Sequence, residues 1–421
     1  MFLNIDAGEM EGEPEAIFSL AQVVNIACGG HAGDDASMAL ALERCARLGS
    51  APGAHPGYED REHFGRWKLE VPPEALRAQV AGQCARLKGL ADARSQRIAH
   101  VKPHGALYHA ANESPALAEA VVQGAMDGLG RDLTVLGPPR GALREAALRA
   151  GLRFAREGFA DRGMRPDGSL VPRGEPGALL EDPARARAQA TRLVLGGSVD
   201  TLCVHGDTPG VVEIAEQARR VIDIGLQPLG DGAVRLSLPR RSEPSAVLET
   251  LRVRPGITDV VVTEQHAAFY FDPLRPPEDP LAALDMAVDM APPTPMLHRV
   301  RVRYDGPDLD EVVRRSGRSR EEVIRLHSSA EYRVQVIGFL PGFAYLGDLP
   351  EELRQPRLGT PRPRVPRGAV AIAGRHTAIY PLDSPGGWNL IGSALDFRAF
   401  HPDKGTVWTL GDRVRFIPEA P

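Results

Sequence analysis

The sequence predicts an α/β protein that begins with a (β/α) barrel and ends with a β-barrel, and three observations support this fold class. Up to about residue 225, strand-like apolar runs alternate with amphipathic helical runs in seven successive units. Nearly every predicted strand in this part ends in polar or ionisable residues. Beyond about residue 297, short strands separated by Pro and Gly take over. Repeated βα units imply a parallel sheet, and even repetition favours a closed barrel over an open sheet.

The seven strands predicted for the first part share an apolar run followed by a polar end. They lie at residues 1–9, 23–31, 50–58, 97–105, 133–139, 152–162 and 201–207. Between them, segments such as 36–50 and 73–93 are rich in Ala, Leu and Arg, with apolar residues at helical spacing. We therefore expect a distorted (β/α) barrel of about seven strands over residues 1–225.

The remainder of the chain is expected to form two smaller parts. The middle part, residues 226–296, is predicted as a small α/β lobe with strands at 228–239 and 258–273 and helices at 242–253 and 279–291. A Pro-rich join follows at residues 291–299, and such composition is typical of a linker or domain edge. Residues 297–421 contain many short strands punctuated by Pro and Gly, which predicts a β-barrel domain.

Composition argues against several classes of function. The 421-residue chain has a formal net charge of -5 and no Lys/Arg-rich run, which argues against a nucleic-acid partner. Its four cysteines lack paired spacing, so neither a disulfide framework nor a thiolate zinc site is indicated. The first residues lack the basic and apolar regions of a signal peptide, and no apolar run approaches the roughly 18 residues of a membrane span. We expect a cytoplasmic protein that acts on a small molecule and uses neither a membrane nor nucleic acid.

The polar strand ends form the candidate active site. In a barrel of this kind the carboxyl ends of the strands converge on one mouth, so residues far apart in sequence meet there. The stretch "HVKPHGALYH" (100–109) gathers a lysine and three histidines at a single strand end. The residues expected to carry chemistry at this mouth are Asp6, Glu9, His31, His55, Lys102, His104, His205 and Asp207.

A less specific interpretation and a metal-site interpretation stand beside this one. A single Asp or His at a strand end is about as often a helix cap or a structural hydrogen bonder, and Asp34 or Asp207 could simply cap the helix that follows it. Alternatively, imidazole and carboxylate groups from separate strands could bind Zn²⁺ or Mn²⁺. The candidate metal ligands are Asp6, His55, His104 and His205. The identity of such a metal is left open.

Seven motifs, all in register, resemble the LamB/YcsF family, the A-type component of bacterial 5-oxoprolinase. They are "LNIDAGE", "NIACGGHAGD", "GAHPGY", "HVKPHGALY", "EGFADR", "LVPR" and "CVHGDTPG". The rest of the chain is similar to the KipI-like B-type component of the same enzyme. The motifs concerned are "PLGDGAV", "GFLPGFAYLG", "PRVPRGAVAIAG" and "SPGGWNLIG". The chain therefore resembles a natural A–B fusion, and this resemblance implies a cyclophilin-like β-barrel for residues 297–421.

The resemblance implies ATP-dependent hydrolytic opening of 5-oxo-L-proline (pyroglutamate) to L-glutamate. The chain would act with a separate C-type subunit, which is KipA-like and related to biotin-dependent carboxylases, and ATP with Mg²⁺ would be used through that complex. Ring opening needs an electrophilic carbon, an activated water and a protonated leaving nitrogen. Asp6, Glu9, His104 and Asp207 are candidates for the proton transfers, and Lys102 for binding the substrate carboxylate.

A further set of residues is expected to bind substrate. It comprises Asn4, Asp34, Tyr108, Arg162, Arg173, Phe343, Gly386, Gly387 and Trp388. Two other functions remain open at this point, namely a metal-dependent amide or deacetylase-type hydrolase and a regulatory binding protein of the kinase-inhibitor type.

Overall fold

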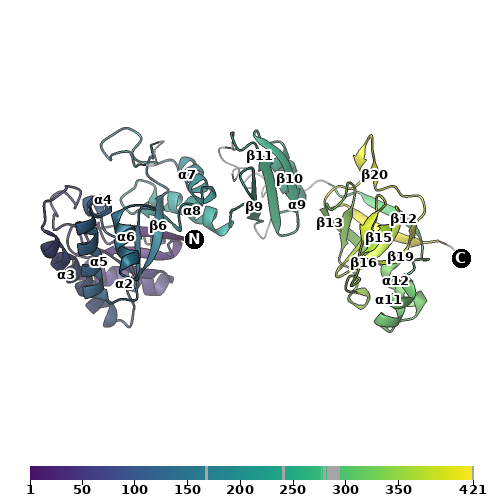
Figure 1. Cartoon of the computed structure of the whole chain (residues 1–421), viewed down its shortest axis with the longest axis horizontal. Coiled ribbons are helices and arrows are strands. Elements are labelled where there is room, and N and C mark those ends of the chain that lie inside the picture. The colour runs from purple at the N-terminus through teal and green to yellow at the C-terminus, as the bar shows by residue number, and fades with distance from the viewer. Residues whose placement is uncertain (166–168, 239–241, 276, 278–280, 282–293, 420–421) are drawn as a thin grey trace. The chain divides into compact units, whose positions relative to one another are not determined.

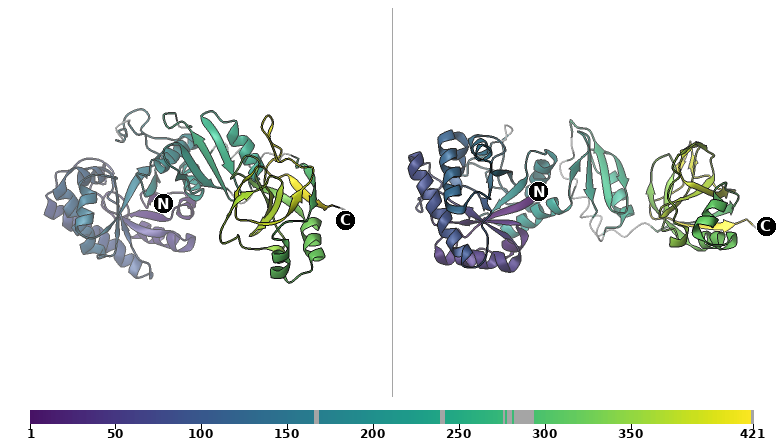
Figure 2. Two further views of the ribbon diagram at one scale, coloured as in Figure 1. Left: turned by 45° about the vertical axis from the view of Figure 1, so that its right-hand side comes forward. Right: turned by 60° about the horizontal axis from the view of Figure 1, so that its bottom comes forward.

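The computed structural model describes residues 1–165, 169–238, 242–275, 277, 281 and 294–419 (Figure 1). These residues divide into two compact units, Met1–Pro228 and Leu229–Pro421. In the first unit, seven parallel strands close into a barrel in the order β1-β2-β3-β4-β5-β6-β7, and helices surround the strands (Figure 2). The predicted (β/α) barrel of about seven strands is confirmed.

Each strand of this barrel is followed by one or two helices. The strands are β1 (Phe2–Ala7), β2 (Val23–Ala27), β3 (Ala51–His55), β4 (His100–Val101), β5 (Thr134–Gly137), β6 (Arg153–Phe159) and β7 (Thr201–His205). The helices are α1 (Ala16–Leu20), α2 (Asp35–Leu48), α3 (Pro73–Asp92), α4 (Gly105–Glu113), α5 (Pro115–Leu129), α6 (Ala142–Arg149), α7 (Pro183–Leu195) and α8 (Val211–Asp223).

Alternation along β1 explains how one strand serves both the hydrophobic core and the barrel interior. Leu3 and Ile5 are fully buried apolar residues, and Asn4 and Asp6, which alternate with them along the strand, point to the opposite face. On that interior face, Asp6 lies opposite Asn25 of β2 and opposite His205 of β7. The register of the sheet therefore places polar side chains from neighbouring strands at one level, near the carboxyl ends.

The second unit contains three antiparallel strands in the order β10-β11-β9 and a second closed barrel. The barrel has the order β12-β19-β16-β17-β14-β13-β22. Barrel neighbours are antiparallel except β12 and β22, which are parallel. The predicted α/β lobe and β-barrel are thus present as folds.

A short strand, β8 (Gln227–Pro228), ends the first unit. The elements of the lobe are β9 (Ala233–Ser237), α9 (Pro244–Arg252), β10 (Ile257–Val262) and β11 (His266–Phe271). The elements of the second barrel and its appendages are β12 (Leu297–Arg303), α11 (Leu309–Ser316), α12 (Arg320–Ser329), β13 (Glu331–Ile337), β14 (Ala344–Gly347), η1 (Glu351–Leu353), β15 (Arg362–Val365), β16 (Ala369–Ala373), β17 (His376–Ile379), β18 (Ser384–Gly386), β19 (Asn389–Ala394), β20 (Phe400–His401), β21 (Gly405–Thr406) and β22 (Arg413–Pro418).

Two predictions for this region need comment. The helix predicted at 279–291 lies outside the described residues, apart from residue 281. The Pro-rich join predicted at 291–299 extends too far, because Leu297–Arg299 already belong to strand β12 and pair with β22. Among the described residues, no helix is both long and apolar enough to cross a membrane.

Candidate active site

A cavity of about 440 Å³ lies at the carboxyl ends of the strands of the first barrel. Its lining includes residues from five strand ends and from the loops that follow them. Among them are Asp6, His55, Lys102, His104, Tyr108, Phe159, Arg162, Arg173 and His205. Convergence of the strand ends, inferred from the repeat pattern, is what brings these residues together.

The floor of the cavity contains a buried ion group centred on Lys102. Its ammonium lies 3.0 Å from both carboxylate oxygens of Asp6 and 3.0 Å from Glu157 Oε1. It also lies 3.0 Å from Cys203 Sγ. Lys102, Asp6 and Glu157 are each 2% exposed. The ammonium is therefore saturated by internal partners, which argues against the predicted role of Lys102 in binding the substrate carboxylate.

The charges of this group stabilise one another against burial. Burial alone would raise the pKa of Asp6, but the neighbouring His55 and Lys102 outweigh it and lower that pKa below its usual range. Burial alone would lower the pKa of Lys102, but Asp6, Cys203 and Glu157 raise it well above its usual value. Asp6 and Lys102 thus form a buried ion pair at neutral pH.

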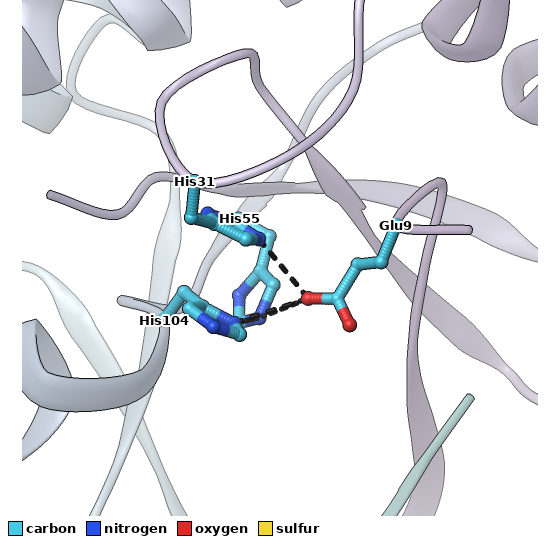
Figure 3. Close-up of side chains that lie close together, drawn as sticks. All are labelled: Glu9, His31, His55 and His104. Carbon is cyan, nitrogen blue, oxygen red and sulfur yellow. Dashed lines mark hydrogen bonds and ion pairs between the residues drawn. The ribbon is translucent and has the colours of Figure 1, made fainter. Parts of the chain in front are cut away.

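Beside this group, three histidines face one carboxylate (Figure 3). Glu9 Oε1 lies 3.0 Å from His31 Nε2, 3.0 Å from His104 Nδ1 and 3.6 Å from His55 Nε2. The rings of His31 and His104 stack in parallel with centroids 3.6 Å apart. We call these four residues the histidine–glutamate cluster. Its members come from four separate strand ends, so the prediction that these strand ends meet is correct.

The backbone around the cluster fixes the position of each ring. The His55 Nδ1–H donates to the Lys102 carbonyl at 2.7 Å, and the His104 Nε2–H donates to the Phe64 carbonyl at 2.9 Å. A Cβ at Gly57 would lie 2.6 Å from His31 Nδ1, and one at Gly65 would lie 2.7 Å from His31 Cβ. Only glycine fits at these two positions, which explains "GAHPGY" and "HFGRW" in structural terms.

The loop that presents Glu9 is held by a residue that sequence reasoning did not single out. The Glu13 carboxylate accepts hydrogen bonds from the backbone amides of Gly8, Glu9 and Met10. Burial alone would raise the pKa of Glu9, but the neighbouring imidazoles of His104 and His31 lower it well below its usual range. Burial is also the main cause that lowers the pKa of His31 to about 4 and that of His55 to about 3.

His205 is oriented by a buried aspartate. Its ring Nδ1–H and its backbone amide both donate to the Asp161 carboxylate, at 3.0 and 2.9 Å. Thr208 Oγ1 donates to the same carboxylate at 2.7 Å. In the neutral ring with its proton on Nδ1, Nε2 is the acceptor nitrogen, and it lies 3.9 Å from Asp6 Oδ2. The strand-end pattern included Asp161 but gave it no role.

A group of arginines lies along another side of the cavity. Asp207 accepts hydrogen bonds from Arg173, at 2.9 and 3.3 Å, and from Arg66. The prediction that Asp207 transfers protons is not supported by this arrangement, because its carboxylate is engaged by two guanidinium groups. Arg162 lines the cavity, but its guanidinium donates to the carbonyls of Ala178 and Val171.

Two of the predicted substrate-binding residues have structural partners instead. Asn4 is fully buried, donates to Thr201 and Leu202, and accepts from Asn25. Asp34 is exposed and is the N-cap of α2, where it forms a capping box with Ser37. Both predictions are corrected here: Asn4 supports the floor of the barrel, and Asp34 caps a helix, as the less specific interpretation allowed.

The candidate metal ligands divide into two groups. His55 and His104 belong to the histidine–glutamate cluster, while Asp6 and His205 form a second group with Cys203.

Tyr108 is buried beside the group formed by Asp6, His205 and Cys203. Burial raises its pKa well above the usual value, and the Glu157 carboxylate adds to that shift. Glu157 was missed because it lies inside strand β6, and a charged residue within a strand gives no signal of its own.

In the second unit, the predicted glycine-rich motifs do come together. Phe343 and Trp388 have ring centroids 5.6 Å apart, and both belong to one buried cluster with Tyr380. A Cβ at Gly386 would lie 2.3 Å from the Tyr380 hydroxyl, and the Gly387 carbonyl accepts from the Leu358 amide at 2.7 Å. Close packing therefore explains why glycines occupy these positions. Substrate binding by Phe343, Gly386, Gly387 and Trp388 stays a prediction.

Comparison with known proteins identifies the family of the chain. Residues 1–229 match the model described as LamB/YcsF family. The chain belongs to the LamB/YcsF family. Residues 224–409 match the model described as carboxyltransferase domain, subdomain C and D, so the LamB/YcsF part is followed by a part of a second type, as in a fusion.

Relatives of the LamB/YcsF part are covered over almost their whole length. The A-type subunit of 5-oxoprolinase from Methylococcus capsulatus is 43% identical over 234 residues, 52% of this chain and 90% of that protein. The corresponding 5-oxoprolinase subunit from Nocardia farcinica is 45% identical over 237 residues, 52% of this chain and 93% of that protein. Among solved structures, the Lactam Utilization Protein from Thermus thermophilus is 34% identical, with a TM-score of 0.49, over 53% of this chain and 95% of that chain.

Proposed function

We propose that this chain catalyses the ATP-dependent hydrolytic opening of 5-oxo-L-proline to L-glutamate, as part of a complex with a C-type subunit. Membership of the LamB/YcsF family and relatives named as 5-oxoprolinase subunits support the substrate class. The observation that carries the proposal is the pairing of His205 with Asp161 beside a cavity that is also lined by arginines. The cavity thus combines an imidazole that can transfer a proton with guanidinium groups that can bind an anion.

The arginines account for recognition of an anionic lactam. Arg66 and Arg173 both line the cavity, and their side chains are 36% and 26% exposed. A guanidinium binds a carboxylate or phosphoryl group through two parallel hydrogen bonds. Asp207 holds both guanidinium groups in place, so it acts as a positioning residue rather than as a base.

Once the anion is bound, the remaining chemistry is activation of the ring carbon by ATP and proton transfer by a residue of the cavity. ATP, as co-substrate of the complex, phosphorylates the lactam oxygen and makes the ring carbon electrophilic. His205 Nε2 takes a proton from the attacking water and returns it to the ring nitrogen as the C–N bond breaks, which leaves an acyl phosphate. A second water hydrolyses this acyl phosphate, so that phosphate is released and L-glutamate remains. Asp161 holds the tautomer and stabilises the imidazolium that forms in between.

The second unit supports the need for a partner. Its match to a carboxyltransferase-type model, and the word subunit in the names of the relatives, are consistent with an assembly of several chains. We propose that residues 229–421 act as the B-type component and bind the C-type subunit, which would supply the ATP-dependent step. Joining the two components in one chain keeps them at equal concentration.

The test is co-expression of the full chain with a C-type subunit from the same genome, followed by glutamate release from 5-oxoproline with and without ATP. We expect release only with ATP, and a marked loss with Arg173→Gln at sub-saturating substrate, because that guanidinium binds the anion. His401→Ala, in the other unit, is the control and should match the wild type. Release without ATP would favour the metal-dependent amide hydrolase instead. No release with a C-type subunit that is active with another A–B pair would refute the proposal.

A further inference from the structure

The histidine–glutamate cluster contains an electrostatic conflict that its hydrogen bonds do not resolve. Backbone carbonyls only accept hydrogen bonds, so His55 Nδ1 and His104 Nε2 must each carry a proton. In a neutral imidazole the other nitrogen is then an unprotonated acceptor. These two acceptors, His55 Nε2 and His104 Nδ1, lie only 3.0 Å apart. Two lone pairs therefore face each other at hydrogen-bond distance.

The Glu9 carboxylate makes this conflict larger. Glu9 Oε1 is a third acceptor, 3.0 Å from His104 Nδ1 and 3.6 Å from His55 Nε2. The side chains of Glu9, His55 and His104 are 3%, 1% and 7% exposed, so bulk water does not separate them. Buried acceptors without a donor cost free energy, and clusters of them are stable only when a positive charge lies among them.

We propose that the histidine–glutamate cluster binds a divalent transition-metal ion of the zinc class. Its ligand atoms would be Glu9 Oε1, His31 Nε2, His55 Nε2 and His104 Nδ1, which all lie within 4.8 Å of one another. Metal–ligand distances of about 2.0–2.1 Å in a tetrahedron place neighbouring ligand atoms about 3.3 Å apart. Four of the six separations are 3.0, 3.0, 3.0 and 3.6 Å, close to this value, and the other two are within 4.8 Å.

The surroundings of the ligands fit this assignment. A histidine that binds a metal usually donates its other ring N–H to a backbone carbonyl or carboxylate, as His55 and His104 do here. Three imidazoles and one carboxylate suit Zn²⁺, Cu²⁺, Ni²⁺ or Fe²⁺ better than Mg²⁺ or Ca²⁺, which prefer oxygen ligands. Because His55 and His104 also line the cavity, the ion would lie at its wall and could polarise a bound carbonyl or water.

A single proton is the rival occupant. A protonated His104 could share its Nδ1–H between Glu9 and His55, and this would remove most of the conflict without a metal. Metal binding by the isolated chain distinguishes the two solutions. The measurement needs neither substrate, ATP nor a partner, so its outcome is independent of the proposed reaction.

The experiment uses the full chain, purified with a tag that contains no histidine, treated with chelator and then titrated with Co²⁺. We expect one Co²⁺ per chain, with the visible absorption of a tetrahedral site, and displacement by Zn²⁺. Glu9→Gln and His104→Gln should each weaken Co²⁺ binding by about 10²-fold or more, since loss of even an outer partner costs 10–100-fold. Far-UV circular dichroism establishes that the variants are folded.

His109→Ala is the matched control, because His109 is an exposed histidine of α4 next to the cluster in sequence but not among its ligands. It should bind Co²⁺ as the wild type does. If the wild type binds Co²⁺ no more tightly than the folded His104→Gln variant, the metal site is refuted and the proton is the occupant. If His109→Ala weakens binding as much as Glu9→Gln does, the ion lies elsewhere and the assignment is also refuted.

Discussion

Replacing Lys102 by methionine tests the buried ion group at the floor of the cavity. The change keeps most of the side-chain volume but leaves Asp6 and Glu157 without their shared counter-ion, from which each is 3.0 Å away. At that separation the attraction is about 5 kcal/mol per pair for an effective dielectric constant of about 20. Stranding a buried charge by removing its partner costs about 3–5 kcal/mol in measured cases. We expect a loss of this size in the free energy of unfolding of the first unit.

The assay is urea unfolding of the full chain, monitored by far-UV circular dichroism. A thermal melt of the same protein is recorded in parallel. A loss of 3–5 kcal/mol corresponds to a melting temperature lower by roughly 6–20 °C for a unit of this size. Lys68→Met is the matched control, because Lys68 and Glu113 form an exposed pair at 3.4 Å and such pairs contribute about 0–1 kcal/mol. Adding Glu157→Gln to Lys102→Met should recover part of the loss. A Lys102→Met protein as stable as Lys68→Met would show that this ion group does not stabilise the barrel.

Three further predictions concern other parts of the chain. Asp161→Asn should lower kcat for ATP-dependent ring opening by about 10²–10⁴-fold, because the charge that orients His205 is lost; an unchanged kcat would contradict the assignment. Asp34→Ala should lower the free energy of unfolding by about 0.5–2 kcal/mol and leave KM unaltered, since Asp34 caps α2; a raised KM would restore its role in binding. Burial lowers the pKa of His327 to about 3. Between about pH 6.5 and about pH 3, His327 is therefore protonated to a greater extent in the unfolded state than in the folded state. The second unit should therefore lose up to about 1.4 kcal/mol per pH unit as the pH falls through this window, and His327→Gln should flatten this dependence in fluorescence of the buried Trp388 and Trp408; an equal slope in both proteins would contradict it.

The fold followed from the sequence because its signals are local and repeated. Apolar runs that end in polar residues mark each strand of the first barrel, and the strand-end rule alone placed Asp6, Glu9 and His55 in one site. Glu157 could not be found in this way, because it lies within β6 and only closure of the barrel brings it to Lys102.

Local signals also fail where a residue's partner decides its role. Asn4 has the alternation of an interior residue, but the sequence does not show that Thr201, Leu202 and Asn25 already satisfy its amide. Arg66 comes from a loop without periodicity, so nothing in the sequence links it to Asp207, which follows it by 141 positions. The sequence therefore predicts which segments form strands or helices, but it does not predict which charged residues pair over long distances in the chain.

The pairing of charges at this site also decides which group is available for proton transfer. Asp6 and Glu157 are bound by Lys102, and Asp207 is bound by arginines, so these carboxylates are engaged as counter-ions. His205 differs, because Asp161 fixes its Nδ1 proton and leaves Nε2 as an acceptor beside the cavity. A nitrogen that is not engaged by a counter-ion can take a proton without breaking an ion pair. In the proposed function, arginines would therefore bind the substrate and an imidazole would transfer the proton, while Asp207 and Asp161 hold these groups in place.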